Sequence, residues 1–162
     1  KGTFYNHFAD KEDLARAIAA ETRARIEEEI GRLNTTVADP ALRMARAVTI
    51  CIRFSLKERQ KLPTLVRLIS SVTDAKHPLN FSLLSDIRDG MAAGVFTCPT
   101  EEVGVTFVVG NTMATISHLQ NISELALARP FMKQMAIMLL VGLGMSRPQA
   151  EKTIEAAHGA LL

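Results

Sequence analysis

Apolar residues recur at three- and four-residue steps along most of the chain, which is the spacing of an amphipathic helix. The clearest such stretch begins after Asp10. Its apolar face consists of Leu14, Ile18, Ile26, Ile30 and Leu33. Asp10 is a typical N-cap residue, and the carboxylates of Glu12 and Asp13 suit the positive end of the helix dipole. We therefore predict a long helix from Asp10 to about Leu33, ended by the segment "NTTVADP".

This first predicted helix also carries charged pairs spaced by about one turn. Glu21 and Arg25 form one i,i+4 pair, and Glu28 and Arg32 form another. In both pairs the acid precedes the base, which is the more favourable order. We expect both pairs to add to the stability of the helix.

Turn residues divide the rest of the chain into further helical stretches. A second helix begins at residues 39–40, because proline suits the first helical turn. Thr100 and Ser146 are expected to cap later helices, and Gly94 and Gly144 to end two of them. The predicted helices after the first span about residues 40–59, 63–72, 78–93, 101–120 and 146–159, with one more that starts at Ser123 or Pro130 and ends near Leu143.

The stretch "EEVGVTFVVGNTMATISHLQ" is the most ambiguous part of the pattern. Its β-branched residues, which favour a strand, are Val103, Val105, Thr106, Val108 and Val109. It continues for about twenty residues without a turn cluster, however, which is too long for a typical strand. We predict a buried helix here. Because no convincing pair of strands occurs elsewhere, we predict an all-α fold.

Composition is that of a soluble globular domain. The 162 residues fit one domain, 48% of them are hydrophobic and supply a core, and the 22% that are charged argue against disorder. The net charge of +2 is too small to predict a nucleic-acid partner by itself. Cys51 and Cys98 stand apart, as reduced thiols of a cytosolic protein do. No signal peptide is visible, and the apolar run "AIMLLVGLGM" is about half a membrane span. We predict a cytoplasmic protein with no membrane segment.

The sequence gives little support to the hypothesis that the protein is an enzyme. The histidines are scattered, with no HExxH motif and no paired cysteines to hold a metal. The segment "GLGMSRPQ" lacks the ending of a phosphate-binding loop, and no GxSxG motif occurs. Ser117 and His118 are adjacent on a predicted helix and so point apart, which excludes a nucleophile–base pair. We predict no enzymatic activity, no metal and no cofactor.

The chain opens with "KGTFYNHF" and continues with "ADKEDLARAIA". On a helix beginning near Gly2, Phe4 and Phe8 are i,i+4 neighbours and form one apolar face. The other side chains of this segment are Thr3, Tyr5, Asn6 and His7. Such a split suits a recognition helix, which needs one anchored face and one face that presents hydrogen-bonding groups to a major groove.

This opening stretch closely resembles the second half of the DNA-binding domain of TetR-family transcriptional regulators. In that family a short recognition helix is followed by a turn and a Lys-Glu-x-Leu helix. The residues that match in order and spacing are Gly2, Thr3, Phe4, Tyr5, His7, Phe8, Lys11, Glu12 and Leu14. The resemblance is specific over about nineteen residues, and elsewhere it rests on the predicted helix lengths.

By this resemblance, we expect the protein to bind double-stranded operator DNA. The residues assigned to bases or to the sugar–phosphate backbone are Thr3, Tyr5 and Asn6. The residues assigned to phosphates are Lys1, His7 and Lys11. Gly2 removes side-chain bulk where the backbone would approach DNA, and Lys11 would meet a phosphate together with a helix N-terminus.

The resemblance also implies a division of the chain and a mechanism. Residues 1–30 would end the helix-turn-helix domain and connect it to a helical regulatory domain at residues 31–162. A homodimer would form through about residues 101–120 and 123–143. A small apolar or amphipathic effector would then release a repressor from its palindromic operator. Because the family has two further helices before this point, we expect the chain to be a fragment that binds DNA poorly on its own.

Polar residues embedded in apolar helices are the candidates for effector binding. Asn111, Thr115 and His118 share one stripe of the valine-rich helix, and Cys51 and Arg53 interrupt an earlier apolar helix. The same pattern equally suits satisfied core groups or a dimer seam. For the protein as a whole, the alternative is an all-α dimeric small-molecule-binding or interaction module without a role at DNA.

Overall fold

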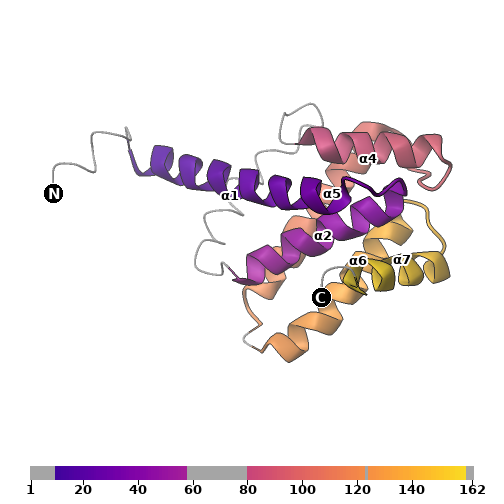
Figure 1. Ribbon diagram of the computed structural model, residues 1–162. Coiled ribbons are helices and arrows are strands. Elements are labelled where there is room, and N and C mark those ends of the chain that lie inside the picture. Colours follow the sequence, from indigo (N-terminus) through magenta and orange to yellow (C-terminus); the bar gives the residue numbers. More distant parts are fainter. Residues whose placement is uncertain (1–9, 58–79, 123, 160–162) are drawn as a thin grey trace.

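The computed structural model describes residues 10–57, 80–122 and 124–159, and these residues form helices and connecting turns without a strand (Figure 1). The helices are α1 (Lys11–Asn34), α2 (Pro40–Lys57), α4 (Phe81–Ala92), α5 (Glu101–Leu119), α6 (Leu125–Gly142) and α7 (Arg147–Gly159). The all-α prediction is therefore confirmed for this part of the chain, including a helix over the valine-rich stretch. The helix predicted over residues 63–72 and the opening segment 1–9 lie outside the described residues.

Two of the predicted N-caps have the expected hydrogen bond. The Asp10 carboxylate accepts a hydrogen bond from the backbone N–H of Asp13 at 2.7 Å, and α1 starts at the next residue, Lys11. The hydroxyl of Thr100 accepts from the backbone N–H of Val103 at 3.2 Å at the start of α5. Each bond satisfies one of the N–H groups that the first helical turn leaves unpaired.

The predicted glycine stops also hold. Gly94, after α4, has a φ of 69°, and Gly144, after α6, has a φ of 112°. Glycine reaches this region of φ without a steric penalty, and it is a common residue just past the end of a helix. α6 starts at Leu125, between the two predicted starts, so that Pro130 lies inside the helix.

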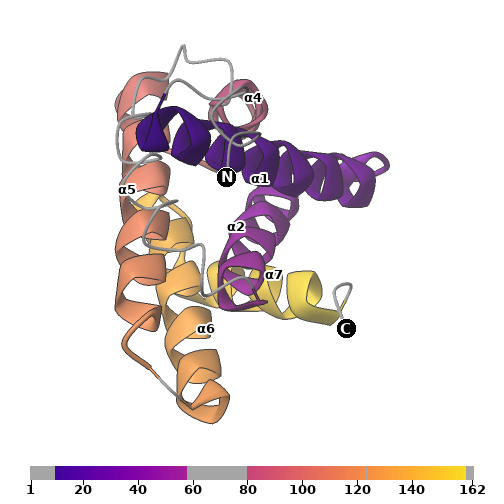
Figure 2. The same cartoon turned by 90° about the vertical axis from the view of Figure 1, so that its left-hand side faces the viewer.

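The second helix of the chain, α2, is the centre of the structure. It contacts α1, α4, α5, α6 and α7. Its fully buried side chains include Met44 and Ile52, which join Ile87 from α4, Leu140 from α6 and Ile154 from α7 in the main hydrophobic core. The other helices therefore surround α2, as Figure 2 shows from the side.

Helix α1 packs on α2 through its C-terminal half. Ile26 and Ile30 are buried against Ile50 and form a second, smaller core with Phe54. Full burial of an isoleucine side chain contributes about 1.5–3 kcal/mol to folding, so these two residues hold α1 to the bundle. The first turns of α1 project beyond the other helices, toward the N-terminal end of the chain (Figure 1).

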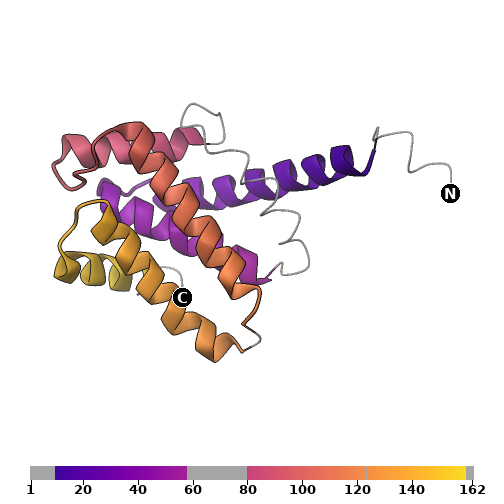
Figure 3. The ribbon, with the colours of Figure 1, turned by 180° about the vertical axis from the view of Figure 1, so that it is seen from behind.

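Helices α5 and α6 run side by side, and in the view from behind they lie in front of α1 and α2 (Figure 3). Their approach is close at Gly142, where an added Cβ would lie 2.4 Å from the ring of Phe107. The outer side of this pair is apolar. Five of the six exposed large hydrophobic residues in the described part of the chain belong to these two helices, namely Val103, Phe107, Leu127, Met138 and Val141.

Candidate functional site: a cavity against helix α1

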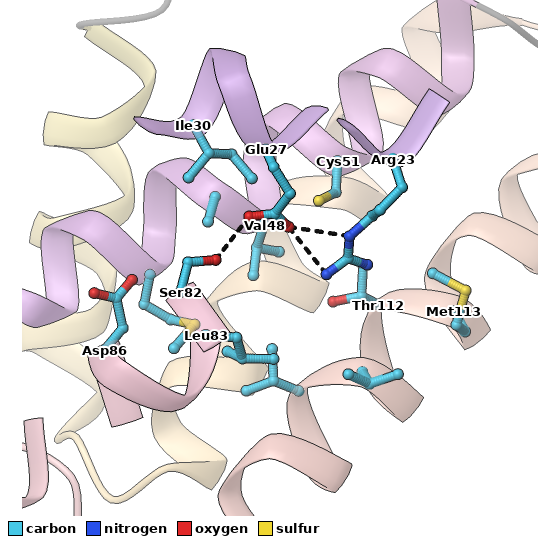
Figure 4. A pocket seen from close by; sticks show the side chains of 14 residues that line it. Arg23, Glu27, Ile30, Val48, Cys51, Ser82, Leu83, Asp86, Thr112 and Met113 are labelled. Carbon is cyan, nitrogen blue, oxygen red and sulfur yellow. Dashed lines mark hydrogen bonds and ion pairs between the residues drawn. The ribbon is translucent and has the colours of Figure 1, made fainter. Parts of the chain in front are cut away.

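A cavity of about 70 Å³ lies where four helices meet. α1, α2, α4 and α5 each contribute side chains to its wall (Figure 4). The lining residues with polar side chains are Arg23, Glu27, Cys51, Ser82, Asp86 and Thr112. The rest of the wall is apolar and includes Ile30, Val48, Leu83, Val108 and Val109. A mostly apolar wall with a few placed polar groups is typical of small-molecule sites.

The polar wall on the α1 side is a hydrogen-bonded chain of three residues. The Arg23 guanidinium donates from Nε to Oε1 of Glu27 at 3.0 Å, and its Nη2 lies 3.0 Å from the same oxygen. The other carboxylate oxygen of Glu27 accepts a hydrogen bond of 2.7 Å from the hydroxyl of Ser82. Figure 4 shows Glu27 between these two partners. Glu27 thus connects α1 to α4 across one edge of the cavity.

A second carboxylate, Asp86 on α4, lies at another edge of the cavity. Its Oδ1 accepts a hydrogen bond of 2.6 Å from Nε of Arg43, which also bonds Asp89. Burial raises the pKa of Asp86 above its ordinary value, and the Arg43 charge opposes that shift. The negative charges of Asp89 and Glu27 raise the Asp86 pKa further. This side of the cavity is therefore a poor environment for additional negative charge.

Cys51 brings a thiol from α2 into the cavity wall. Burial raises the pKa of Cys51 from 9.0 to about 11, the positive charge of Arg23 lowers it and the negative charge of Glu27 raises it. At neutral pH the side chain is therefore an uncharged thiol and a weak nucleophile. It contributes an apolar, polarizable surface to the cavity.

The α5 side of the wall contains one hydroxyl, that of Thr112. The residue is 6% exposed, and its hydroxyl has no hydrogen-bond partner in the part of the chain that the structure describes. Thr49 and Thr115 differ, because each donates to the backbone carbonyl four residues earlier, at 2.8 Å in both cases. Thr112 therefore offers the cavity both a donor and an acceptor.

Of the residues that the sequence analysis assigned to effector binding, Cys51 lines this cavity. Arg53 is on the exposed side of α2, and the hydroxyl of Thr115 is occupied within α5 by its bond to the carbonyl of Asn111. His118 is exposed, and its ring centroid lies 4.4 Å from that of Phe131 on α6. The cavity wall therefore does not include the other four assigned residues, which are Arg53, Asn111, Thr115 and His118.

The residues assigned to DNA lie at the other end of α1. Lys11 is exposed and is the first residue of the helix. The other six, Lys1, Gly2, Thr3, Tyr5, Asn6 and His7, lie outside the described residues. Their role at DNA stays a prediction.

The sequence analysis missed most of the polar wall. Arg23 and Glu27 are an i,i+4 pair in which the base precedes the acid. The pairs predicted from the sequence are neighbouring ones in which the acid precedes the base, because that order is the more favourable one. Arg25 lies over the ring of Phe54, at 5.5 Å from its centroid, and forms no ion pair with Glu21. Ser82 and Asp86 are spaced one turn apart on α4, a signal that has no meaning until α1 is placed opposite them.

Metal sites and membrane spans are two further features that the described helices and turns could contain. No group of three or more His, Cys, Asp or Glu side chains there has a geometry that could hold a metal ion. None of the described helices is both long and apolar enough to cross a membrane.

Fold and cavity together define an all-helical protein, in its described residues, with a small cavity between four helices. Its fold is similar to that of RolR in a crystal structure with the ligand resorcinol, at 21% identity, with 94% of this chain and 75% of that chain covered and a TM-score of 0.68. It is also similar to RolR without ligand, at 22% identity, with 95% and 78% covered and a TM-score of 0.69. No protein-family model and no curated protein matches the sequence. At these identities the similarity shows a shared fold.

Proposed function

We propose that the protein is a ligand-responsive, DNA-binding transcriptional regulator of the TetR type, a repressor that a small effector releases from its operator. The observation that carries this proposal is the position of α1. Its first residue follows directly on the opening segment, and its Arg23 and Glu27 form the polar wall of the cavity. At 1.5 Å per residue, Lys11 and Arg23 are about 18 Å apart along one helix. A ligand that shifts α1 would therefore also shift the segment assigned to DNA.

The shared fold with RolR supports the ligand part of this proposal. That protein was crystallised with resorcinol, a single aromatic ring with two hydroxyl groups. Resorcinol is accordingly the first compound to test as an effector of this protein. Coupling between a ligand and DNA in such a protein is typically worth about 1–3 kcal/mol, which is about a 5- to 150-fold change in DNA affinity.

The exposed faces of α5 and α6 support the proposed homodimer. Large apolar side chains at Phe107, Met138 and Val141 face outward on this pair of helices, where each costs free energy in water. On α5, Gly110 follows Phe107 by about one turn, and no heavy atom lies within 4 Å of a Cβ added to it. A second copy of the same face would cover this patch and form a bundle of four helices.

The test is a titration onto labelled DNA from the gene's own upstream region. We would compare the product of the complete natural reading frame with the 162-residue chain, at two salt concentrations and with and without resorcinol. Sequence-selective binding that weakens as salt increases would support the regulator. Binding to random DNA with equal affinity would favour the interaction module without a DNA role.

Lys11→Ala provides the sharper form of this experiment. Loss of one phosphate contact should weaken binding about equally for all DNA sequences and lower the salt slope by about one. Lys152→Ala is the matched control, because it removes an exposed lysine from α7, which is remote from the N-terminal end of α1 (Figure 1). Equal effects of the two variants would argue against a contact between Lys11 and DNA.

A further inference from the structure

The cavity wall carries charges that are already paired. Glu27 is bonded by Arg23 and Ser82, and Asp86 by Arg43, which does not line the cavity. The lining itself therefore holds two carboxylates and one guanidinium. An anionic ligand would meet this excess of negative charge without an unpaired cation to compensate its lost hydration.

The wall also holds hydrogen-bonding capacity that the protein does not use. Thr112 is 6% exposed and lines the cavity, and its hydroxyl lacks the bond to its own helix that Thr49 and Thr115 make. The Glu27 oxygen that accepts from Ser82 has a second lone pair. A ligand that bonds Thr112 therefore gains a hydrogen bond for which no group of the described chain competes.

The size of the cavity limits the ligand. Its 70 Å³ compares with about 150 Å³ for an apolar cavity that takes up benzene. The unbranched side chains of Met44 and Met113 line it, and methionine readily changes its rotamer to fit an irregular space. Movement of these two side chains would admit one ring, whereas fused rings or long chains would require the helices to separate.

We propose that the cavity binds a small uncharged compound, with an apolar body of at most one ring and one or two hydroxyl groups. A ligand hydroxyl donates to the Glu27 carboxylate or exchanges a hydrogen bond with Thr112, and the ring contacts the apolar wall formed by Val48, Leu83 and Val108. This ligand class rests on the proposed function, in which the cavity is the effector site.

The test uses probes that share one ring and differ in charge and hydrogen bonding. Phenol, toluene, benzoate and benzylamine would each be titrated onto the 162-residue chain at pH 7 by calorimetry. We expect phenol to bind at least tenfold more tightly than the other three. Tightest binding of benzoate or of benzylamine would overturn the proposal in favour of a charged ligand, and equal binding of toluene and phenol would overturn the hydrogen bond.

Thr112→Val locates the interaction, because valine keeps the shape of threonine and removes the hydroxyl. It should weaken phenol binding about three- to tenfold, the equivalent of one hydrogen bond, and leave toluene binding unchanged. Thr115→Val is the matched control, since the hydroxyl of Thr115 donates to the backbone carbonyl of Asn111 and Thr115 does not line the cavity. Equal losses of phenol binding in both variants would contradict the assignment, as would a complete absence of phenol binding to a chain that circular dichroism shows to be folded.

The proposed ligand class and the proposed regulator function can fail separately, and the DNA-binding and phenol-binding measurements distinguish the two cases. Selective operator binding without phenol binding would remove the ligand class and keep the regulator. Phenol binding that depends on Thr112, in a protein without any DNA preference, would keep the ligand class and favour a binding module.

Discussion

At the scale of single residues, the negative charges of the carboxylates around the cavity disfavour one another. Asp86 is half-buried within the field of Asp89 and Glu27, and Arg43 compensates only part of the cost. Burial, the largest cause, raises the pKa of Asp86 above its ordinary value of 3.8. A raised pKa means that the folded state binds this proton more tightly than the unfolded state does.

Stability should consequently depend on pH through Asp86. The contribution of this residue to the free energy of unfolding is fully present below the ordinary pKa of 3.8 and is lost as the pH rises through the raised value of the folded state. We expect the stability of the natural protein relative to an Asp86→Asn variant to decrease from about pH 4 toward neutral pH. Urea unfolding of both proteins at several pH values measures this difference, and a difference independent of pH would contradict it.

At the scale of secondary-structure elements, the connection between α4 and α5 depends on one close contact. The backbone carbonyl of Gly90, in the last turn of α4, accepts hydrogen bonds from the N–H groups of Val95 and Phe96 at 2.9 and 3.0 Å. The ring of Phe96, 2% exposed, then packs on the α-carbon of Gly90. A Cβ at residue 90 would lie 2.0 Å from this ring.

Gly90→Ala should therefore lower the free energy of unfolding by about 1–3 kcal/mol, because the ring of Phe96 has to leave its place in the core. Gly31→Ala is the matched control in α1, where nothing lies within 4 Å of an added Cβ. That variant should raise stability by about 0.5–1 kcal/mol through the better helix propensity of alanine. Denaturant unfolding compares the two variants, and an unchanged or raised stability of Gly90→Ala would show that Phe96 moves aside at little cost.

At the scale of the whole molecule, the apolar face of α5 and α6 carries most of the exposed large hydrophobic side chains of the described residues. Its side chains belong to helices that also supply the core, so the same two elements stabilise the fold from inside and expose apolar side chains outside. Met132 and Met145, which the sequence places in the same methionine-rich stretch as Met138, are buried and belong to the core.

Met138→Glu tests the proposed dimer. The side chain of Met138 is 60% exposed, so the variant should fold, but a charge at the centre of an apolar interface should weaken association at least tenfold. Phe81→Glu is the matched control, because it changes a residue of α4 that is 58% exposed and lies off the α5–α6 face. Sedimentation velocity over a range of protein concentrations measures both, and an unchanged dimer in Met138→Glu would exclude this face.

The helices and their ends were predictable from the sequence because they depend on local interactions. The caps at Asp10 and Thr100 and the stops at Gly94 and Gly144 act within one turn of the backbone, so residue type and spacing suffice to predict them. The valine-rich α5 was predictable from its length, which outweighed the strand preference of its β-branched residues.

The cavity depended on the tertiary structure. Glu21–Arg25, Arg23–Glu27 and Glu28–Arg32 all have helical spacing, and only the packing of α1 on α2 and α4 turns Arg23 and Glu27 inward. On α5, similarly, Thr112 and Thr115 differ by less than one turn, yet one faces the cavity and the other bonds its own helix. A helix of 3.6 residues per turn has side chains on all of its sides, and its own sequence does not say which neighbour each side will meet.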